Sequence, residues 1–400
     1  MRSTIHALLL SVTLAAAAAG CSDSSGPGST AGAYAGGGTR ANLYPDGGGA
    51  VTSFTEVTFD SLTTGFLGAP LPIGEQRIAA VTADHRLLRI AYRSIENAYT
   101  FPTGIYPLPE LAVDSLGTLY AVTTNGGLHA IDTGGVERWT ASIEEIGAES
   151  FHLPTWPVTT GGGIVAGSTS GRLRGFGFDG APQWERTFGA GLVRSVAHRS
   201  DVGIVAGVTH GDHAMSDTVI VLDEEGRERW RTAVGGRIEV GPIIVGERIA
   251  VGVAGRAADG KYRPALLLLD ISGKEKGRPP LDVLPLALAG DAAGNIYVAG
   301  GGGSRGIGGV VASFTAEGKN RWDVGLTRNA PLALLVAGES IYFVVAYQSS
   351  IGVYSYSLEG TYQAFTPIEA LASIVVQPFL YPGGRVTVAS NDSPLILSGR

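Results

Sequence analysis

The chain has 400 residues, with 29 Lys and Arg against 36 Asp and Glu, so its formal net charge is −7. Glycine, with 60 residues, is about twice as frequent as usual, and charged residues, at 16%, fall well below the usual level of about 25%. An acidic balance without a basic block argues against a nucleic-acid partner. A single cysteine excludes an internal disulfide and any cysteine-rich metal site, and a hydrophobic content of 44% excludes global disorder.

Residues 1–20 are predicted to be a signal peptide. Arg2 precedes a mostly apolar run from Ile5 to Ala19, which is short and ends in small residues, as export signals do. The run Ala18-Ala19-Gly20-Cys21 resembles the lipobox of bacterial lipoproteins, which implies that Cys21 carries a lipid. Ala18 departs from the aliphatic residue that this motif prefers. The alternative is ordinary signal cleavage that leaves a free thiol.

Residues 21–49 are predicted to be a flexible tether, because they are rich in Gly and Ser and carry little apolar surface. Ser22, rather than Asp, follows the predicted lipidated cysteine, which by the enterobacterial sorting rule resembles an outer-membrane destination. No later apolar stretch approaches the roughly 20 residues of a spanning helix, so the lipid alone would be the anchor. The sequence therefore predicts a protein attached to the outer membrane that faces the periplasm or the cell surface.

The body of the chain, residues 50–400, repeats with a period near 45 residues. Four tryptophans follow a glycine by four residues, and they lie 45, 46 and 92 residues apart: Trp139, Trp184, Trp230 and Trp322. The repeat glycines continue through units that lack the tryptophan, at Gly135, Gly180, Gly226, Gly273, Gly318 and Gly360. Such a regular series indicates a repeat architecture.

Each unit also contains short apolar or alternating runs before its glycine. The run 163–167 is one example, and the runs 248–252 and 265–270 are a successive pair. Four short strands in 40–45 residues are typical of one β-propeller blade. Counting units predicts an all-β, eight-bladed β-propeller of four-stranded antiparallel blades. The last unit lacks its fourth strand, so residues 49–60 are predicted to close the ring from the N-terminal side.

The segment from Leu128 to Trp139, with Val113–Val122 before it, resembles the PQQ-like propeller repeat, and the resemblance covers roughly residues 50–400. Two activities use this repeat. Quinoprotein dehydrogenases hold pyrroloquinoline quinone and Ca²⁺, whereas lipoproteins similar to the outer-membrane assembly subunit BamB act as scaffolds without a cofactor. The scaffold implies envelope proteins as partners, outer-membrane assembly components among them, for a monomer on a lipid anchor.

The dehydrogenase alternative lacks support among the residues. Many of those enzymes place a pair of adjacent cysteines over the quinone, and this chain has one cysteine. No Glu, Asn and Asp set matches their calcium-ligand segments either. We therefore expect a non-catalytic protein without catalytic, cofactor or metal residues. A periplasmic quinoprotein-like dehydrogenase, or another ligand-binding propeller enzyme, remains the alternative.

Several residue groups have both a chemical and a structural interpretation. The four repeat tryptophans are expected to dock one blade on the next rather than to form a ligand platform. The segment from His210 to Asp217 holds the densest set of potential metal ligands, but its loose spacing favours a solvated polar loop. Asp114 and Asp291 precede turn glycines and are expected to stabilise turns. Trp156 lies outside the repeat pattern, and core packing is expected for it.

Three insertions fall between the same two strands of successive blades, at residues 211–217, 256–264 and 301–309. They are expected to project from one face of the disk, where loops on a rigid scaffold form binding surfaces.

Overall fold

Strands make up all the regular secondary structure in the part of the chain that the computed structural model describes. That part comprises residues 21–22, 43–44, 54–58, 64–68, 70–73, 77–91, 94–143, 157–168, 170–189, 191–210, 216–256, 262–301, 308–326, 331–347, 350–368, 379–381, 385–389 and 395–399. None of it forms a helix that could cross a membrane. The predicted all-β class is confirmed.

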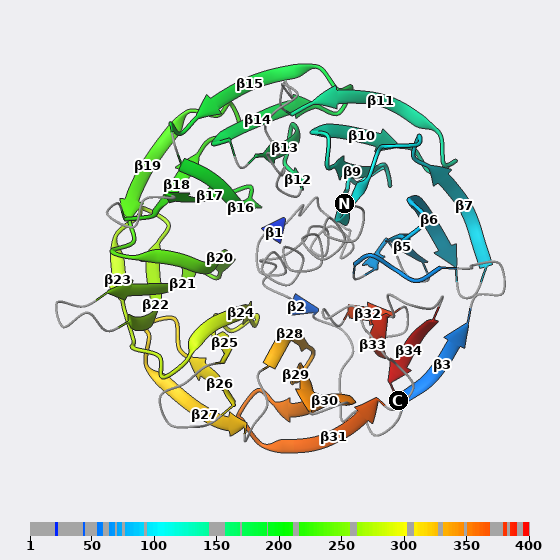
Figure 1. Ribbon diagram of the computed structural model, residues 1–400. Coiled ribbons are helices and arrows are strands. Elements are labelled where there is room, and N and C mark those ends of the chain that lie inside the picture. The colour runs from blue at the N-terminus through cyan, green and yellow to red at the C-terminus, as the bar shows by residue number, and fades with distance from the viewer. Residues whose placement is uncertain are drawn as a thin grey trace, which may run out of the picture.

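Eight sheets stand around a central axis like the blades of a propeller (Figure 1). The first four blades run, from the axis outward, as β4 (Leu71–Pro72), β5 (Arg77–Val81), β6 (Arg86–Ala91) and β7 (Ser94–Thr100); β8 (Pro107–Val113), β9 (Leu119–Thr123), β10 (Gly127–Ile131) and β11 (Glu137–Ser142); β12 (Val158–Thr159), β13 (Gly163–Gly167), β14 (Arg172–Gly177) and β15 (Pro182–Thr187); and β16 (Gly191–Arg199), β17 (Gly203–His210), β18 (Thr218–Leu222) and β19 (Glu228–Ala233).

Blades 5 to 8 continue the ring in the same order. Their strands are β20 (Arg237–Val245), β21 (Arg248–Arg256), β22 (Tyr262–Asp270) and β23 (Glu275–Gly277); β24 (Leu284–Gly290), β25 (Ile296–Gly301), β26 (Gly309–Phe314) and β27 (Asn320–Leu326); β28 (Pro331–Ala337), β29 (Ser340–Tyr347), β30 (Ser350–Ser357) and β31 (Tyr362–Ile368); and β32 (Phe379–Tyr381), β33 (Arg385–Ala389), β34 (Leu395–Gly399) and β3 (Phe54–Thr58).

The ring is closed by a strand from the N-terminal side, as predicted. β3 pairs antiparallel with β34, with Phe54 opposite Gly399 and Thr58 opposite Leu395. It is the outermost strand of blade 8, whose other three strands come from residues 379–399. The closing segment predicted at residues 49–60 therefore contains the strand, and the blade count of eight is confirmed.

Two dipeptides add a fifth strand to two of the blades. β1 (Cys21–Ser22) pairs in parallel with β16, and β2 (Leu43–Tyr44) pairs in parallel with β28. Both lie within the predicted tether, of which residues 23–42 and 45–49 fall outside the described residues. The tether and the signal peptide at residues 1–20, which is also outside them, stay predictions.

Antiparallel order gives the disk two different faces. In blades 1 to 7 the strand ends that join the first strand to the second and the third to the fourth lie at one side, which we call the turn face. The second-to-third hairpins and the passages from one blade to the next leave at the opposite side, which we call the loop face. The three predicted insertions join β17 to β18, β21 to β22 and β25 to β26, and the described ends of these strands lie at the loop face.

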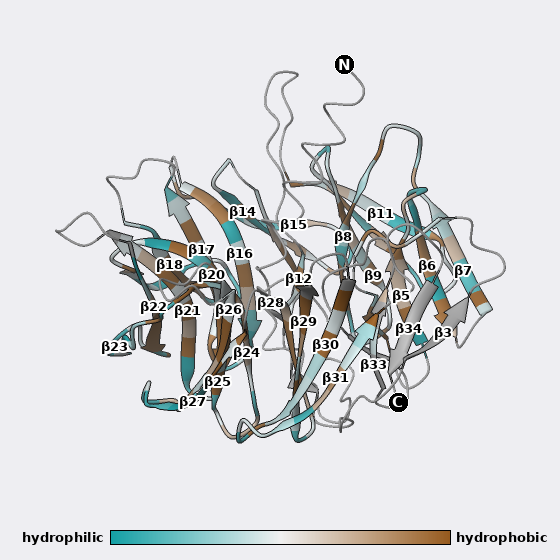
Figure 2. Cartoon of the chain, turned by 60° about the horizontal axis from the view of Figure 1, so that its bottom comes forward, coloured by the Kyte–Doolittle hydropathy of each residue, from teal (hydrophilic) through white to brown (hydrophobic). Residues whose placement is uncertain are grey.

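The apolar core lies in layers between neighbouring blades. One buried cluster spans blades 1 and 2, a second spans blades 2 and 3, and a larger one extends from Ala197 to Phe314 through blades 4, 5 and 6. The inner strands are buried on both sides, as in β9, whereas the outermost strand β7 alternates between exposed and half-buried residues. Figure 2 shows hydrophobic residues along inner strands such as β16 and β29.

Candidate functional site

Four outer strands place a tryptophan at the seam between two blades. Trp139 in β11 donates its indole N–H to the carbonyl oxygen of Phe178 in blade 3, at 2.9 Å. The other three make the same bond at 2.8–2.9 Å: Trp184 to Glu224, Trp230 to Ile271 and Trp322 to Leu358. Each acceptor lies two residues before the turn glycine of the next blade, and that glycine lies against the indole ring. The four rings therefore occupy separate seams and do not share one ligand surface.

Other seams use different residues at the same place. Asn97 in β7 donates from Nδ2 to the carbonyl oxygen of Thr133 at 2.8 Å, the acceptor position that the tryptophans use elsewhere. Gly277 takes the tryptophan position in blade 5, and there Pro279 packs against Gly318 of blade 6. The repeat tryptophans do not mark these two seams, because neither carries an aromatic residue at that position.

The burial of Asp217 contradicts the prediction of a solvated loop at this residue. Asp217 is fully buried at the loop face, where its two carboxylate oxygens accept the backbone N–H groups of His210, at 2.8 Å, and Ile238, at 2.7 Å. The carboxylate thus joins blade 4 to blade 5 with charge-assisted bonds, and a solvated loop is wrong for this residue. Asp212 and His213 lie outside the described residues. Within the described part of the chain, no three His, Cys, Asp or Glu residues gather into a metal site.

The two predicted aspartate turns are confirmed. Oδ1 of Asp114 accepts the backbone N–H groups of Leu116, at 2.9 Å, and Thr118, at 2.8 Å, while Oδ2 accepts the hydroxyl of Tyr120. Burial, together with this carboxylate, raises the pKa of Tyr120. Asp291 binds Tyr297 in the same way in blade 6. Both carboxylates therefore serve the turn and a buried tyrosine.

Two histidine–glutamate pairs were not found from the sequence. Nε2 of His198 lies 2.6 Å from Oε1 of Glu224, and Nδ1 of His129 lies 2.6 Å from Oε1 of Glu137. Burial works to raise the pKa of both glutamates, but the hydrogen bonds that each carboxylate accepts, the imidazole's foremost, and the attraction of the histidine together outweigh it and hold each pKa below its usual range. The imidazoles are enclosed, since the His198 side chain is 1% exposed and that of His129 8%. These pairs support the fold and offer no imidazole to a substrate.

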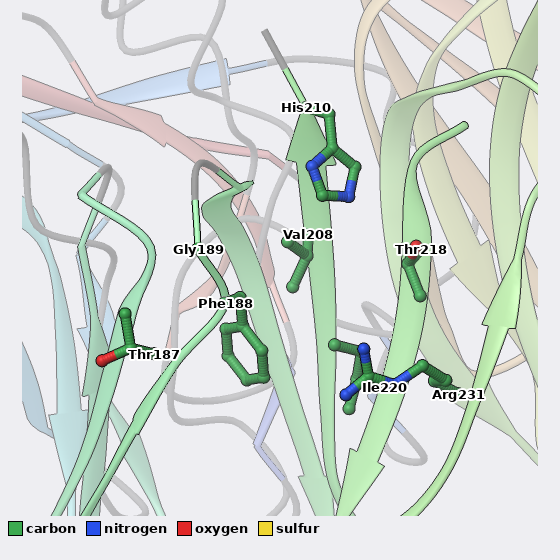
Figure 3. A pocket seen from close by; sticks show the side chains of 8 residues that line it. All are labelled: Thr187, Phe188, Gly189, Val208, His210, Thr218, Ile220 and Arg231. Atoms are coloured by element: carbon green, nitrogen blue, oxygen red, sulfur yellow. The ribbon is translucent and has the colours of Figure 1, made fainter. Parts of the chain in front are cut away.

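A pocket of about 270 Å³ opens between blades 3 and 4 (Figure 3). One wall is the face of blade 4, where cross-strand neighbours bring Val208 beside Thr218 and Ile220 beside Arg231. The opposite wall is the end of β15 and the connection that follows it, with Phe188 as its large side chain. His210, at the end of β17, places the opening toward the loop face. The other lining residues are Thr187 and Gly189.

The remaining predicted positions cannot be placed. Trp156 and the side chain of Cys21 lie outside what the structure describes.

Together, the closed ring and its antiparallel blades define the chain as a β-propeller. Among solved structures it is similar to BamB from Moraxella catarrhalis, with 16% identity, a TM-score of 0.63, and coverage of 88% of this chain and 100% of that one. It is also similar to the C-terminal WD40 domain of Sif2, with 11% identity, a TM-score of 0.62, and coverage of 88% and 99%. The computationally designed Ika8 protein matches with 12% identity, a TM-score of 0.60, and coverage of 88% and 100%. No protein-family profile and no curated protein sequence matches the chain.

Proposed function

We propose that this chain is a non-catalytic propeller lipoprotein that binds other envelope proteins and holds them for assembly. The observation that carries the proposal is the asymmetry of the disk. In three successive blades the strand ends that frame the predicted insertions lie at the loop face, and the pocket described above opens toward the same face. A rigid ring that presents irregular loops on one side is suited to protein recognition. The likeness to BamB and to a WD40 domain supports this proposal through the fold.

Attachment to the outer membrane through Cys21 is part of the same proposal. It is supported by the lipobox-like run 18–21 and by Ser22. The test is to grow the cells with an alkyne analogue of palmitate and to separate their membranes by density. We expect the native chain to carry the label and to appear in the outer-membrane fraction. The Cys21→Ala variant should carry no label and should be absent from that fraction. A native chain without label would refute the anchor.

Partner binding is tested by capture of the tagged chain from its own cells after detergent extraction. We expect envelope proteins to co-purify with the native chain and to be lost when residues 256–262 are replaced by a two-residue turn. Leu116→Ser is the matched control, because Leu116 is 82% exposed on the turn face and should not affect capture.

Two outcomes would contradict the scaffold. One is equal recovery of every protein by the native chain and by the shortened variant. The other is stoichiometric quinone absorbance or Ca²⁺ in the purified protein, which would support the quinoprotein-like dehydrogenase instead.

A further inference from the structure

The pocket between blades 3 and 4 occupies a position that is filled at other seams. After the outer strands of blades 1 to 4, a backbone N–H donates back to a carbonyl oxygen of the same blade: Phe101 to His85, Ile143 to Gly126, Phe188 to Gly171 and Val234 to Asp217. The side chains at this closing position are buried in blades 1, 2 and 4, with Phe101 3% exposed and Ile143 and Val234 0%. Phe188 is only half-buried, although it packs against the apolar cluster between blades 3 and 4, and a pocket lies beside it at this seam.

Small residues keep the seam open. Gly189, directly after Phe188, has no atom within 4 Å of the position where a Cβ would stand. At Gly191, a Cβ would lie 2.5 Å from Cγ1 of Val208 and 3.1 Å from Cε1 of His210, so a side chain there would displace two pocket residues. A side chain at residue 191 would therefore disturb one wall of the pocket, while glycine at 189 leaves the space beside Phe188 unobstructed.

The size of the pocket suits one large side chain. Its volume of about 270 Å³ lies below the roughly 300–1,000 Å³ of ordinary small-molecule and cofactor sites. Phe188, Val208 and Ile220 supply apolar walls, and Val208 and Ile220 are at most 2% exposed. An apolar side chain inserted here would be removed from water on several sides, as anchor residues are in protein interfaces.

The rim of the pocket is rich in hydrogen-bond donors. Arg231 binds Glu228 through Nε, at 2.6 Å, and Nη2, and within the described residues no hydrogen bond engages its Nη1. Thr187, Thr218 and His210 also line the pocket, with His210 at one end and Arg231 at the other (Figure 3). The guanidinium N–H of Arg231 complements a carboxylate, which accepts hydrogen bonds and carries the opposite charge.

We propose that this pocket binds an extended, acidic peptide segment of the partner protein, with one phenylalanine-sized side chain inserted between blades 3 and 4 and a neighbouring carboxylate at Arg231. The proposal rests on the proposed scaffold function and names the chemistry of its partner. Binding involves no covalent step.

The probe is a fluorescein-labelled peptide, Ser-Asp-Phe-Asp-Ser, titrated with the full chain in detergent and followed by fluorescence anisotropy. We expect saturable binding that weakens about tenfold or more when the peptide phenylalanine is replaced by alanine, because its apolar contacts are lost. Replacing both peptide aspartates by asparagine should weaken binding about threefold to tenfold, and more so at low salt.

Variants of the chain locate the peptide. Thr218→Phe fills the pocket from β18 and should abolish binding, while Arg231→Ala should weaken it about as much as removing the peptide carboxylates. Arg227→Ala is the matched control, because Arg227 is also an exposed, carboxylate-paired arginine of blade 4 but lies at the turn face. Because Arg231 is 60% exposed, its substitution leaves the fold intact even if Thr218→Phe does not.

The outcomes separate this inference from the scaffold itself. Absence of saturable binding, or binding that Arg231→Ala and Thr218→Phe leave unchanged, overturns the pocket assignment. Capture of envelope proteins that depends on the loop-face hairpins would then still support the scaffold. Peptide binding without any captured partner would support the pocket and refute the scaffold.

Discussion

Substitution of the turn glycine at a tryptophan seam tests the docking of one blade on the next. Gly273 has a φ of +86°, and a Cβ there would lie 2.6 Å from Cε3 and 2.7 Å from Cδ2 of Trp230. Gly104 has nearly the same φ, +89°, but nothing stands within 4 Å of its Cβ position. Comparing alanine substitutions at these two glycines therefore distinguishes the cost of backbone strain from the cost of contact with the indole.

The expected free energies follow from these two environments. For Gly104→Ala, a left-handed alanine costs about 1–2 kcal/mol, and the stiffer unfolded chain returns about 0.4–1 kcal/mol, which leaves a net loss of about 1 kcal/mol. Gly273→Ala adds overpacking against Trp230, worth about 1–3 kcal/mol. We therefore expect Gly273→Ala to lower the free energy of unfolding by about 2 kcal/mol more than Gly104→Ala.

The assay is urea denaturation followed by far-ultraviolet circular dichroism, with each variant also made in a Trp230→Ala background. Removing the indole should bring the cost of Gly273→Ala down to that of Gly104→Ala, because only the backbone strain remains. Equal losses for the two glycine variants in the native background would refute the reasoning, since the indole would then impose no constraint on the turn.

Three further predictions concern polar contacts. Asn97→Ala removes the hydrogen bond to Thr133 and should lower the free energy of unfolding by about 1 kcal/mol in urea denaturation; an unchanged midpoint would show that this seam does not need the bond. Asp217→Asn replaces one of two buried acceptor oxygens by a donor and should cost about 2–3 kcal/mol, measured in the same way; a loss below about 0.5 kcal/mol would contradict its role between blades 4 and 5. The pKa of Glu224 is lowered in the folded protein, so its pairing with His198 stabilises the fold above the ordinary value of 4.5 and is lost as the pH falls through the lower folded pKa. Glu224→Gln should therefore flatten the fall of the melting temperature below pH 4.5, and superimposable profiles for native and variant protein would refute this.

The repeat made the fold predictable. Trp139, Trp184, Trp230 and Trp322 stand at equal offsets from a turn glycine, because the same side chain meets the same backbone in each seam. The closing strand was also predictable, since an unpaired last blade required a partner and only one spare alternating segment preceded the first blade. Both inferences depend on features that recur or on backbone pairing that has to be completed.

The candidate site was not predictable for the opposite reason. The pocket lies beside Phe188, which is less buried than Phe101 and Ile143 at the same position of their blades, and no sequence motif distinguishes these three residues. Asp217 was expected in solvent because its neighbours in sequence are polar. Its partners are backbone groups from other strands, one of them in the next blade, and the sequence carries no sign of them.

The pairing of β3 with β34 determines when the ring can close during synthesis and folding. Phe54 pairs with Gly399, which lies 345 residues later in the chain, so β3 is synthesised long before the strand with which it pairs. Until then, two strand edges remain unpaired and are open to wrong partners or to proteases. Contacts this distant in sequence slow folding. A chain truncated before β34 would thus keep an unpaired strand edge in blade 8, and only a chain that includes β34 can close the ring.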